Sequence, residues 1–321
     1  MTPERPVVII DGLSVFMRHY CANPSMSSNG EHMGGFAGFL GSVREISQRF
    51  TPSKIVVVWE GGGSKKRRLI DKAYKNGRRP AKLNRYYDDI PDTQTNRNSQ
   101  LSKLVSALRH TPVKQIYVPD CEGDDAVAHL TRVVMRDEGK HVIIVSSDRD
   151  FYQLISDSVS VWSPGKRKLI GPAECVEEFN VHPNNFALAK AIVGDPGDHV
   201  LGVKGVGYKS LSKRVPGFDS DNQLCFQDVL SVCQVSRETS KAKIYVDIPD
   251  EAERIKKNIR LVSLDAGTLP ATIEKKIEEA YKSSVTGGKP NKIELYRMII
   301  REGLSKIDVD SIFFSLRTVS A

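Results

Sequence analysis

The chain has 321 residues, of which 40% are hydrophobic and 27% are charged. That length supports one large domain or two smaller ones, and the composition is ordinary for a globular protein. No apolar run approaches the roughly 18 residues of a membrane helix, and no signal-peptide pattern begins the sequence. We therefore expect a cytoplasmic protein without membrane contact. Five cysteines in no CxxC pair predict free thiols, and the seven histidines form no zinc-binding pattern.

The net charge of +8 is concentrated in one segment, residues 65–85, which we call the basic strap. It holds ten basic residues and one acid, Asp71, so it carries +9 while the rest of the chain carries −1. Such a run can be a solvated face, but it is more typical of a contact with a polyanion. Tyrosines such as Tyr74 lie among these cations. They could stack on single-stranded bases or pack the strap against the core, and the sequence does not separate these alternatives.

Short β-branched runs at 7–10, 54–59, 115–118, 141–145 and 159–162 predict five strands. Continuous apolar runs of this length are typical of strands buried on both faces of a parallel sheet. Apolar residues at helical spacing predict helices between them, at 36–50 and 126–135. The alternation predicts an α/β fold, with a mostly parallel central sheet, helices on both faces, and the fifth strand as its end.

The basic strap interrupts this alternation between the second and third strands. About 55 residues separate Glu60 from Gln115, far more than a crossover helix requires, so we expect a functional insertion at about 61–110. The α/β core is expected to span residues 1–171. Residues 172–321 are expected to be mainly helical, with a glycine-rich turn between two helices at about 199–214.

Acidic residues follow each of the first four predicted strands. The carboxyl ends of parallel strands meet at one edge of a sheet, so we expect these side chains to converge. A further acidic pair lies in a later loop. The whole set is Asp11, Glu60, Asp120, Glu122, Asp124, Asp125, Asp148, Asp150, Asp195 and Asp198.

Carboxylates within ~5 Å of one another repel by several kcal/mol per pair, so they must be protonated, solvated or bound to cations. Ligands that are all oxygen favour hard cations, Mg²⁺ with Mn²⁺ as a substitute. Two such ions ~4 Å apart can catalyse phosphoryl transfer. A single aspartate, such as Asp120, Asp125 or Asp150, could instead cap a helix. Capping does not explain four successive strands that end in acid, so the sequence predicts a two-metal phosphodiesterase.

The glycine-rich turn, Gly202 to Gly207, suits a helix-hairpin-helix-like element. Its glycines permit close backbone approach, so main-chain N–H groups can bind a phosphate, and Lys204 and Lys209 add charge. Such contacts to a duplex backbone are independent of base sequence. Glycine is also common in turns between helices that bind nothing.

Taken together, several segments resemble, in order and spacing, the structure-specific 5′-nuclease family, which includes flap endonucleases and the 5′-nuclease domains of bacterial DNA polymerases. They are Val8–Gly12, Val58–Gly61, Arg67, Tyr74–Arg78, Glu122–Asp125, Ser147–Leu154 and Gly194–Gly207. Three more segments resemble the phage members of this family, the T-even ribonucleases H. These are Val161–Pro164, Asn258–Asp265 and Arg301–Ile307. A phage protein that acts in a bacterial cytoplasm is therefore expected.

The resemblance implies roles for individual residues. A first ion would be held by Asp11, Glu60, Glu122, Asp124, Asp125 and Asp148, and a second by Asp150, Asp195 and Asp198. Lys75 would reach the scissile phosphate, with Arg78 and Arg67 nearby. The strap would form a helical arch around a 5′ single strand, and the glycine-rich turn would hold duplex DNA and a monovalent cation. The implied nucleic-acid contacts are Lys65, Lys66, Arg68, Tyr74, Arg79, Lys82, Arg85, Gly202, Lys204, Gly205, Gly207 and Lys209.

The family implies a 5′-to-3′ exonuclease and flap endonuclease that acts on branched DNA and on RNA primers annealed to DNA, in replication or repair. A monomer is expected, with a replisome single-strand-binding protein as a partner. Glu60 stands where the family usually has aspartate, and Pro196 lies in the second acidic loop. Two alternatives stay open. One is a PIN-type ribonuclease for single-stranded RNA, which the basic strap and the glycine-rich turn argue against. The other is a binding scaffold without catalysis, which Glu60 motivates.

Overall fold

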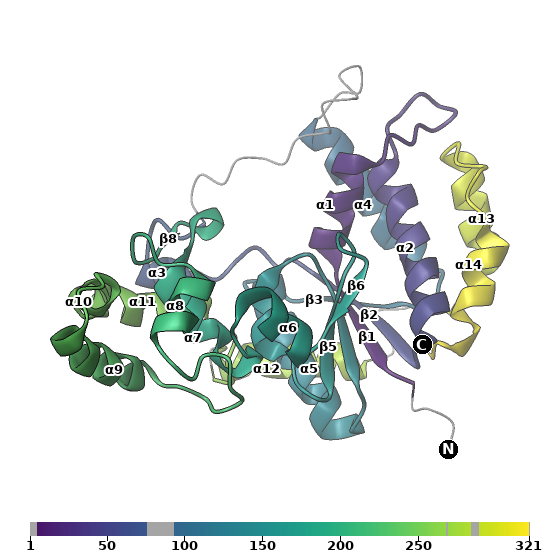
Figure 1. Cartoon of the computed structure of the whole chain (residues 1–321). Coiled ribbons are helices and arrows are strands. Elements are labelled where there is room, and N and C mark those ends of the chain that lie inside the picture. Colours follow the sequence, from purple (N-terminus) through teal and green to yellow (C-terminus); the bar gives the residue numbers. More distant parts are fainter. Residues whose placement is uncertain (1–4, 76–92, 268, 284–288, 321) are drawn as a thin grey trace.

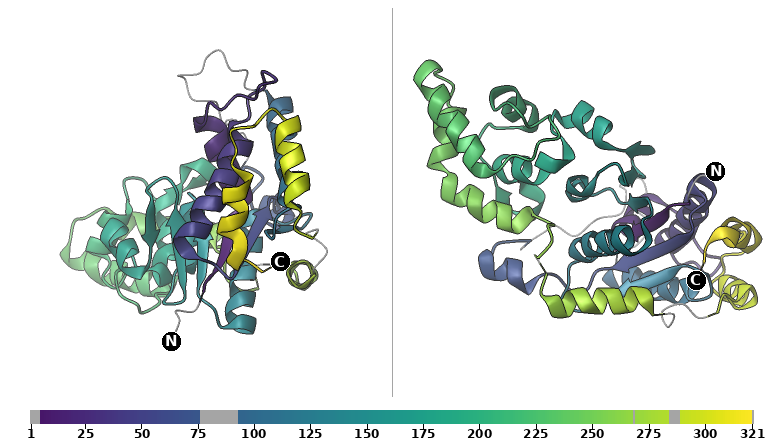
Figure 2. Two further views of the ribbon diagram at one scale, coloured as in Figure 1. Left: turned by 90° about the vertical axis from the view of Figure 1, so that its right-hand side faces the viewer. Right: turned by 90° about the horizontal axis from the view of Figure 1, so that it is seen from below.

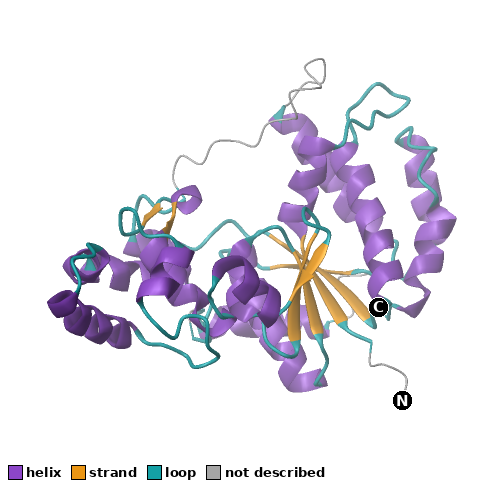
Figure 3. Cartoon of the chain, viewed as in Figure 1, coloured by secondary structure: helices purple, strands orange, loops and turns teal. Residues whose placement is uncertain are grey.

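The computed structural model describes residues 5–75, 93–267, 269–283 and 289–320. A central sheet carries helices on both faces, and a further group of helices extends to one side (Figures 1 and 3). The strand order is β3-β2-β1-β4-β5-β6, and only β6 runs antiparallel to its neighbour. The strands are β1 (Val7–Asp11), β2 (Lys54–Trp59), β3 (Lys114–Tyr117), β4 (Val142–Val145), β5 (Val159–Ser163) and β6 (Lys168–Ile170).

The five predicted strands and the α/β class are confirmed, but the expectation that the fifth strand ends the sheet is wrong. Strand β6 pairs with β5 across a tight turn and forms the edge. It has three residues, and Lys168 and Leu169 are exposed. A strand this short and this exposed lacks the apolar run by which the other strands are recognised.

Alternate residues of each strand point into two separate cores, because side chains along a strand alternate between the faces of the sheet. Val8 and Ile10 pack into the core on one face, and Val7 and Ile9 into the core on the other. All four are fully buried. A strand covered on both faces must be apolar throughout, which explains the continuous apolar runs in the sequence.

Helices far apart in the sequence cover the first face together. Figure 2 shows α13 and α14, near the C-terminus, beside the N-terminal α2. Buried side chains of both, such as Leu295 and Ile312, join the same core as Phe36 and Leu40 of α2. The helices of this face are α1 (Gly12–Ala22), α2 (Gly34–Phe50), α4 (Gln94–Leu108), α13 (Lys292–Arg301) and α14 (Val309–Ser315), which the short η5 (Leu316–Thr318) follows.

The other core contains the longest helix of the opposite face, α5, and extends from it into the group of helices that lies to one side (Figure 1). These elements are α5 (Gly123–Glu138), η2 (Arg149–Leu154), α6 (Pro172–Phe179), α7 (Pro183–Val193), α8 (Tyr208–Arg214), α9 (Phe226–Thr239), α10 (Ile244–Asp250), α11 (Ala252–Val262) and α12 (Ala271–Lys282). Between α7 and α8 lie β7 (Gly194–Asp195), η3 (Pro196–Asp198) and β8 (Val200–Leu201). Within the described ranges no helix is long and apolar enough to cross a membrane. All five cysteines are free thiols, as predicted.

Candidate active site

Asp11 and Asp148 show how the strand ends place carboxylates at one edge of the sheet. Asp11 ends β1 and caps α1, since its Oδ1 accepts a hydrogen bond from the backbone N–H of Ser14 at 3.1 Å. Asp148 follows β4 and caps η2 in the same way, accepting from the backbone N–H of Asp150 at 2.9 Å. Ser146 links the two ends, because its hydroxyl donates to Asp11 Oδ2 at 2.8 Å. These aspartates therefore cap helices and also belong to a cluster of carboxylates, and the capping hydrogen bonds fix the direction in which their side chains point.

Five of the acidic side chains form two groups that share one member. Oxygen atoms of Asp124, Asp148 and Asp150 lie within 4.8 Å of one another, and so do oxygen atoms of Asp150, Asp195 and Asp198. The second group consists of the same three residues that the family resemblance assigns to a second ion. It is assembled by η2 and by the short hairpin of β7 and β8, which encloses η3.

Glu60 lies beside these groups in a loop held by close backbone packing. A Cβ atom on Gly61 would lie 1.8 Å from the carbonyl oxygen of Val118, so only glycine fits there. The Gly61 N–H donates to the Cys121 carbonyl at 3.1 Å, which joins the loops that follow β2 and β3. The exposed Glu60 carboxylate accepts hydrogen bonds from the N–H groups of Gly63 at 3.0 Å and Gly123 at 3.1 Å.

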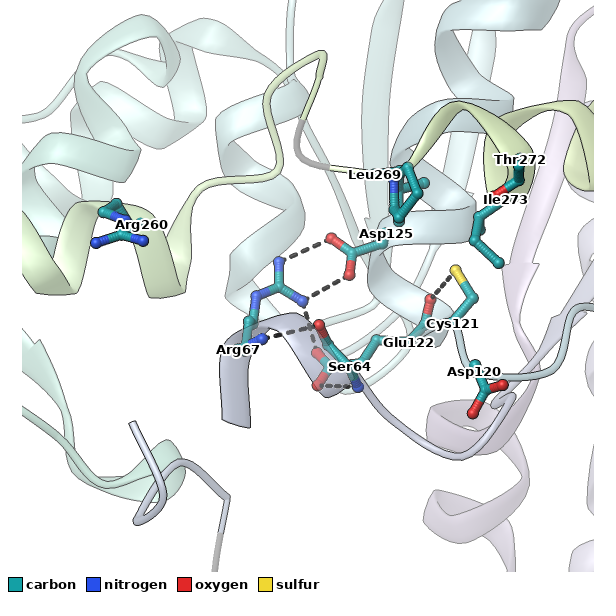
Figure 4. Close-up of a pocket in the computed structure, with 11 residues that line it drawn as sticks. Ser64, Arg67, Asp120, Cys121, Glu122, Asp125, Arg260, Leu269, Thr272 and Ile273 are labelled. Atoms are coloured by element: carbon teal, nitrogen blue, oxygen red, sulfur yellow. Dashed lines mark hydrogen bonds and ion pairs between the residues drawn. The ribbon is translucent and has the colours of Figure 1, made fainter. Parts of the chain in front are cut away.

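Glu122 and Asp125, two of the expected ligands, form buried ion pairs with Arg67 (Figure 4). Arg67 is 5% exposed, and its guanidinium donates to Asp125 at 2.6 and 2.7 Å and to Glu122 at 2.7 Å. It also donates to the carbonyl of Ser263 at 3.2 Å, which ties α3 (Lys65–Ile70) to the end of α11. Neither Glu122 nor Asp125 belongs to the two acid groups. The same ion pairs border a cavity of about 260 Å³.

Lys75 lies between the two acid groups. Its Nζ is 3.0 Å from Glu122, 3.6 Å from Asp124 and 3.8 Å from Asp198, and its backbone N–H donates to the Asp198 carbonyl at 3.2 Å. Burial alone would lower the pKa of Lys75, but the charges of Asp124 and Glu122 raise it above its ordinary value, so the ammonium stays charged. Tyr74 is 7% exposed and its hydroxyl approaches Glu122 at 3.4 Å. For Tyr74 the stacking interpretation is therefore wrong, and the packing alternative holds.

Lys190 is the residue that the sequence reasoning missed. It is 4% exposed, forms an ion pair with Asp150, and lies 2.7 Å from Asp195 Oδ2. It therefore neutralises part of the second acid group from within the protein. The sequence does carry a signal, since Lys190 is the only charged residue in α7.

The acid site holds more negative charge than its own cations balance. Among the described residues, Arg67, Lys75 and Lys190 form ion pairs with six of the nine carboxylates expected as metal ligands. Three paired cations against nine carboxylates leave a formal excess of six negative charges. Burial, together with the nearby charge of Asp148, raises the pKa of Asp124 to about 8 and that of Asp11 to about 6. Protonation at neutral pH is one way to relieve the excess, and bound cations are the other. The oxygen-only donor set fits hard divalent ions.

The glycine-rich turn lies directly after the second acid group. A Cβ atom on Gly202 would lie 1.9 Å from the Val193 carbonyl oxygen, so this glycine permits the close pairing of β7 and β8. Gly205 has a φ of +77°, in a turn closed by a hydrogen bond from the Val206 N–H to the Val203 carbonyl at 3.1 Å. Lys204, Gly207 and Lys209 are exposed on this turn and on the start of α8.

The basic strap is described only in part. Its first helix is α3, on which Arg68 is exposed, but the side chains of Lys65 and Lys66 are outside what the structure describes. Arg78, Arg79, Lys82 and Arg85 also lie outside the described residues. Their expected roles at the scissile phosphate and in nucleic-acid binding remain predictions.

Comparison with known proteins assigns the chain to a family. A family model described as "5'-3' exonuclease, N-terminal resolvase-like domain" matches residues 6–180, and the chain belongs to this family. The chain is 28% identical over 211 residues to the 5′-3′ exonuclease of Buchnera aphidicola subsp. Schizaphis graminum, a match that covers 65% of this chain and 69% of the relative. It is also 28% identical over 222 residues to flap endonuclease Xni of Shewanella woodyi, covering 68% and 79% of the two chains.

The chain is also similar to a longer relative, and it shares its fold with solved structures. The thermostable DNA polymerase I of Thermus thermophilus is 29% identical over 275 residues, which is 84% of this chain but 31% of the polymerase. The fold is shared with the phage T5 D15 protein co-crystallised with metal ions, with a TM-score of 0.61, 20% identity, and coverage of 92% and 98%. The catalytic core of Rad2 in complex with DNA substrate also matches, with a TM-score of 0.53, 13% identity, and coverage of 98% and 91%.

Proposed function

We propose that the chain is a divalent-metal-dependent 5′ nuclease that hydrolyses phosphodiester bonds in branched DNA, both as a flap endonuclease and as a 5′-to-3′ exonuclease. The observation that carries the proposal is the pair of acid groups that share Asp150 at the carboxyl edge of the sheet. Family membership supports the reaction, because the relatives include a 5′-3′ exonuclease and a flap endonuclease. The long basic strap is consistent with a nucleic-acid substrate.

Asp124, Asp148 and Asp150 would hold one Mg²⁺ ion, and Asp150, Asp195 and Asp198 a second, with Asp11 and Glu60 able to contribute through water. When bound, such ions supply an activated water and stabilise the leaving oxygen. Lys75, with its ammonium beside Glu122 and Asp124, would orient the scissile phosphate and stabilise the charge that develops on it. Arg67 would instead fix Glu122 and Asp125 from the protein interior.

The substrate range is a further part of the proposal. The exposed lysines of the glycine-rich turn would hold duplex DNA through backbone phosphates, with a monovalent cation bound at the turn. RNA primers annealed to DNA would be cut as well. The phage T5 flap endonuclease has been solved in a pseudo-enzyme-product complex with DNA and metal ions, and Rad2 with a DNA substrate. We propose that the protein acts as a monomer in a bacterial cytoplasm, with a replisome single-strand-binding protein as a partner.

One experiment compares four 5′-labelled substrates, a DNA flap, a blunt duplex, an RNA–DNA hybrid and single-stranded RNA, each with Mg²⁺ and with chelator. The proposal expects metal-dependent cleavage of the flap and the hybrid. Cleavage of single-stranded RNA alone would identify a PIN-type ribonuclease. Binding of the flap without cleavage of any substrate would identify a scaffold.

Lys75→Ala separates chemistry from binding. Loss of the ammonium at the phosphate should lower the single-turnover rate more than it weakens flap binding, because most affinity comes from other phosphate contacts. The rate would be measured in single-turnover quench experiments and the affinity by fluorescence anisotropy. Equal losses in both quantities would make Lys75 a simple binding residue.

A further inference from the structure

Arg149 stands at the mouth of the acid site but takes no part in its ion pairs. It begins η2, between the aspartates Asp148 and Asp150 in the sequence. Its side chain is exposed and lines a cleft of about 600 Å³ together with Lys190, Asp195 and other residues. It forms no ion pair with a carboxylate anywhere in the described ranges. Its donors are therefore available to a ligand that enters the cleft.

The other cations of the site differ from Arg149 in this respect. Arg67, Lys75 and Lys190 all form ion pairs with carboxylates, and Arg67 and Lys190 are buried. A phosphodiester that approaches the acid site meets a strongly negative surface, so a cation whose charge is not paired with a carboxylate would add to what the paired Lys75 supplies. Arg149 is such a cation.

An aromatic surface holds the guanidinium of Arg149 in place. Its Cζ lies 5.4 Å from the centre of the Phe179 ring, and Phe179 packs edge-to-face on Tyr208 at 5.2 Å. Phe186 stacks on Tyr208 from within the core, at 5.4 Å. A guanidinium that rests on a ring face keeps its in-plane N–H donors free, in the fork geometry that matches two phosphate oxygens.

The position of Tyr208 shows in which direction the cleft runs. Tyr208 is the first residue of α8 and follows Gly207 of the glycine-rich turn, and it lines the same cleft as Asp150 and Asp195. The cleft therefore runs from the second acid group to the turn. Arg149 lies along it, between the place where a strand would be cut and the place where its duplex would be held.

We propose that Arg149 binds a backbone phosphate of the DNA strand in the cleft between the second acid group and the glycine-rich turn, and so helps to set which phosphodiester is cut. This inference rests on the proposed nuclease function. Bidentate contact by an exposed guanidinium gives it a single partner phosphate at a fixed distance along the strand.

A methylphosphonate scan tests the contact directly. Flap substrates that each carry one neutral methylphosphonate linkage would be bound by wild type, Arg149→Ala and Arg149→Lys in chelator, with affinity measured by fluorescence anisotropy. One linkage should weaken wild-type binding by about tenfold, the size of one hydrogen-bonded charge contact. The same linkage should have no added effect in Arg149→Ala. Arg149→Lys, which keeps the charge but not the fork, should lie between the two.

Arg317→Ala is the matched control. Arg317 also lies over a phenylalanine ring, Phe314, at 4.1 Å, but near the amino end of β2, where Ser320 bonds to Ser53. Arg317→Ala should leave the effect of each methylphosphonate linkage on affinity unchanged, and it should leave the log–log salt slope of binding unchanged. Arg149→Ala should lower that slope by about 0.9. Cleavage mapped with Mg²⁺ should also show a less uniform cut position in Arg149→Ala.

The outcomes separate this inference from the function on which it rests. If the wild-type protein neither binds nor cuts the flap, both the nuclease function and the role of Arg149 are wrong. Suppose instead that wild type binds and cuts the flap, and that Arg149→Ala has the same response to each methylphosphonate linkage, the same salt slope and the same cut position. That result would overturn only the role of Arg149. Circular dichroism would confirm that the variants fold.

Discussion

Arg67 allows the sharpest test of how the acid site is held together. Arg67→Met keeps an unbranched, flexible side chain close in length to the arginine stem but removes the guanidinium and its charge. In the native protein the guanidinium pairs with Glu122 and Asp125, which are 3% and 5% exposed. Breaking a buried ion pair from one side costs about 3–5 kcal/mol, because the remaining charge is left buried without its partner. Lys75 still contacts Glu122, so we expect one such loss, from Asp125, rather than two.

The assay is equilibrium unfolding in urea with chelator present, which excludes any contribution from bound metal. Arg67→Met should lower the free energy of unfolding by about 3–5 kcal/mol. Asp125→Asn in that background should recover part of the loss, because a neutral amide costs less to bury than an unpaired carboxylate. Arg68→Met, on the exposed side of the same helix, is the matched control and should change stability by no more than about 0.5 kcal/mol.

One result would refute this reasoning. If Arg67→Met unfolds at the same urea concentration as wild type but loses single-turnover cleavage, Arg67 acts on the substrate phosphate. That is the role that the family resemblance implies, and the buried ion pairs would then contribute little to stability.

Three further predictions concern single groups at the site. Glu60→Asp should keep substantial Mg²⁺-dependent activity, because the charge remains and a water can fill the gap, whereas Glu60→Gln should lose far more. Equal rates in wild type and Glu60→Gln would exclude this carboxylate from the metal site. The ammonium of Lys190 occupies the second acid group between Asp150 and Asp195. Lys190→Met should therefore bind Mn²⁺ more tightly in calorimetry and have a lower melting temperature in chelator. An unchanged Mn²⁺ affinity would contradict this. Burial raises the pKa of Asp124 to about 8. The folded protein therefore keeps a proton on Asp124 at pH values where the unfolded chain, with an ordinary aspartate pKa near 4, has released it. The free energy of unfolding in chelator should therefore fall as pH rises from about 4 to about 8. Asp124→Asn should remove much of that fall in melting temperature, and a melting temperature that rises over this range would count against the assignment.

The sequence predicted those parts of the fold that local pattern determines. Five buried strands and the helices between them follow from apolar periodicity, and parallel topology then brings the strand-end acids to one edge. The structure brings Asp150, Asp195 and Asp198 together, and the ion that they are expected to hold stays a prediction.

The ion-pair network could not be predicted in the same way, because it depends on contacts between distant segments. A run of ten basic residues gives no sign that Arg67 points into the protein while Arg68 is exposed. Helix α3 packs on α11, nearly two hundred residues further along the chain, and the buried Tyr74 approaches Glu122, 48 residues further along. Of these residues, only Lys190 could have been recognised from the sequence, because it is the single charged residue in the otherwise uncharged helix α7.

Metal-dependent nuclease activity is tested most directly by single-turnover cleavage of one 5′-labelled flap by wild type and by Asp148→Asn, with Mg²⁺ and with chelator. Asp148 belongs to an acid group and forms no ion pair in the part of the chain that the structure describes, so its substitution removes one charge without leaving a buried cation unpaired. Wild type should cleave the flap only with Mg²⁺, and Asp148→Asn should lose at least about 10²–10³-fold in rate with flap binding retained. Cleavage by wild type in chelator, or full activity in Asp148→Asn, would contradict it.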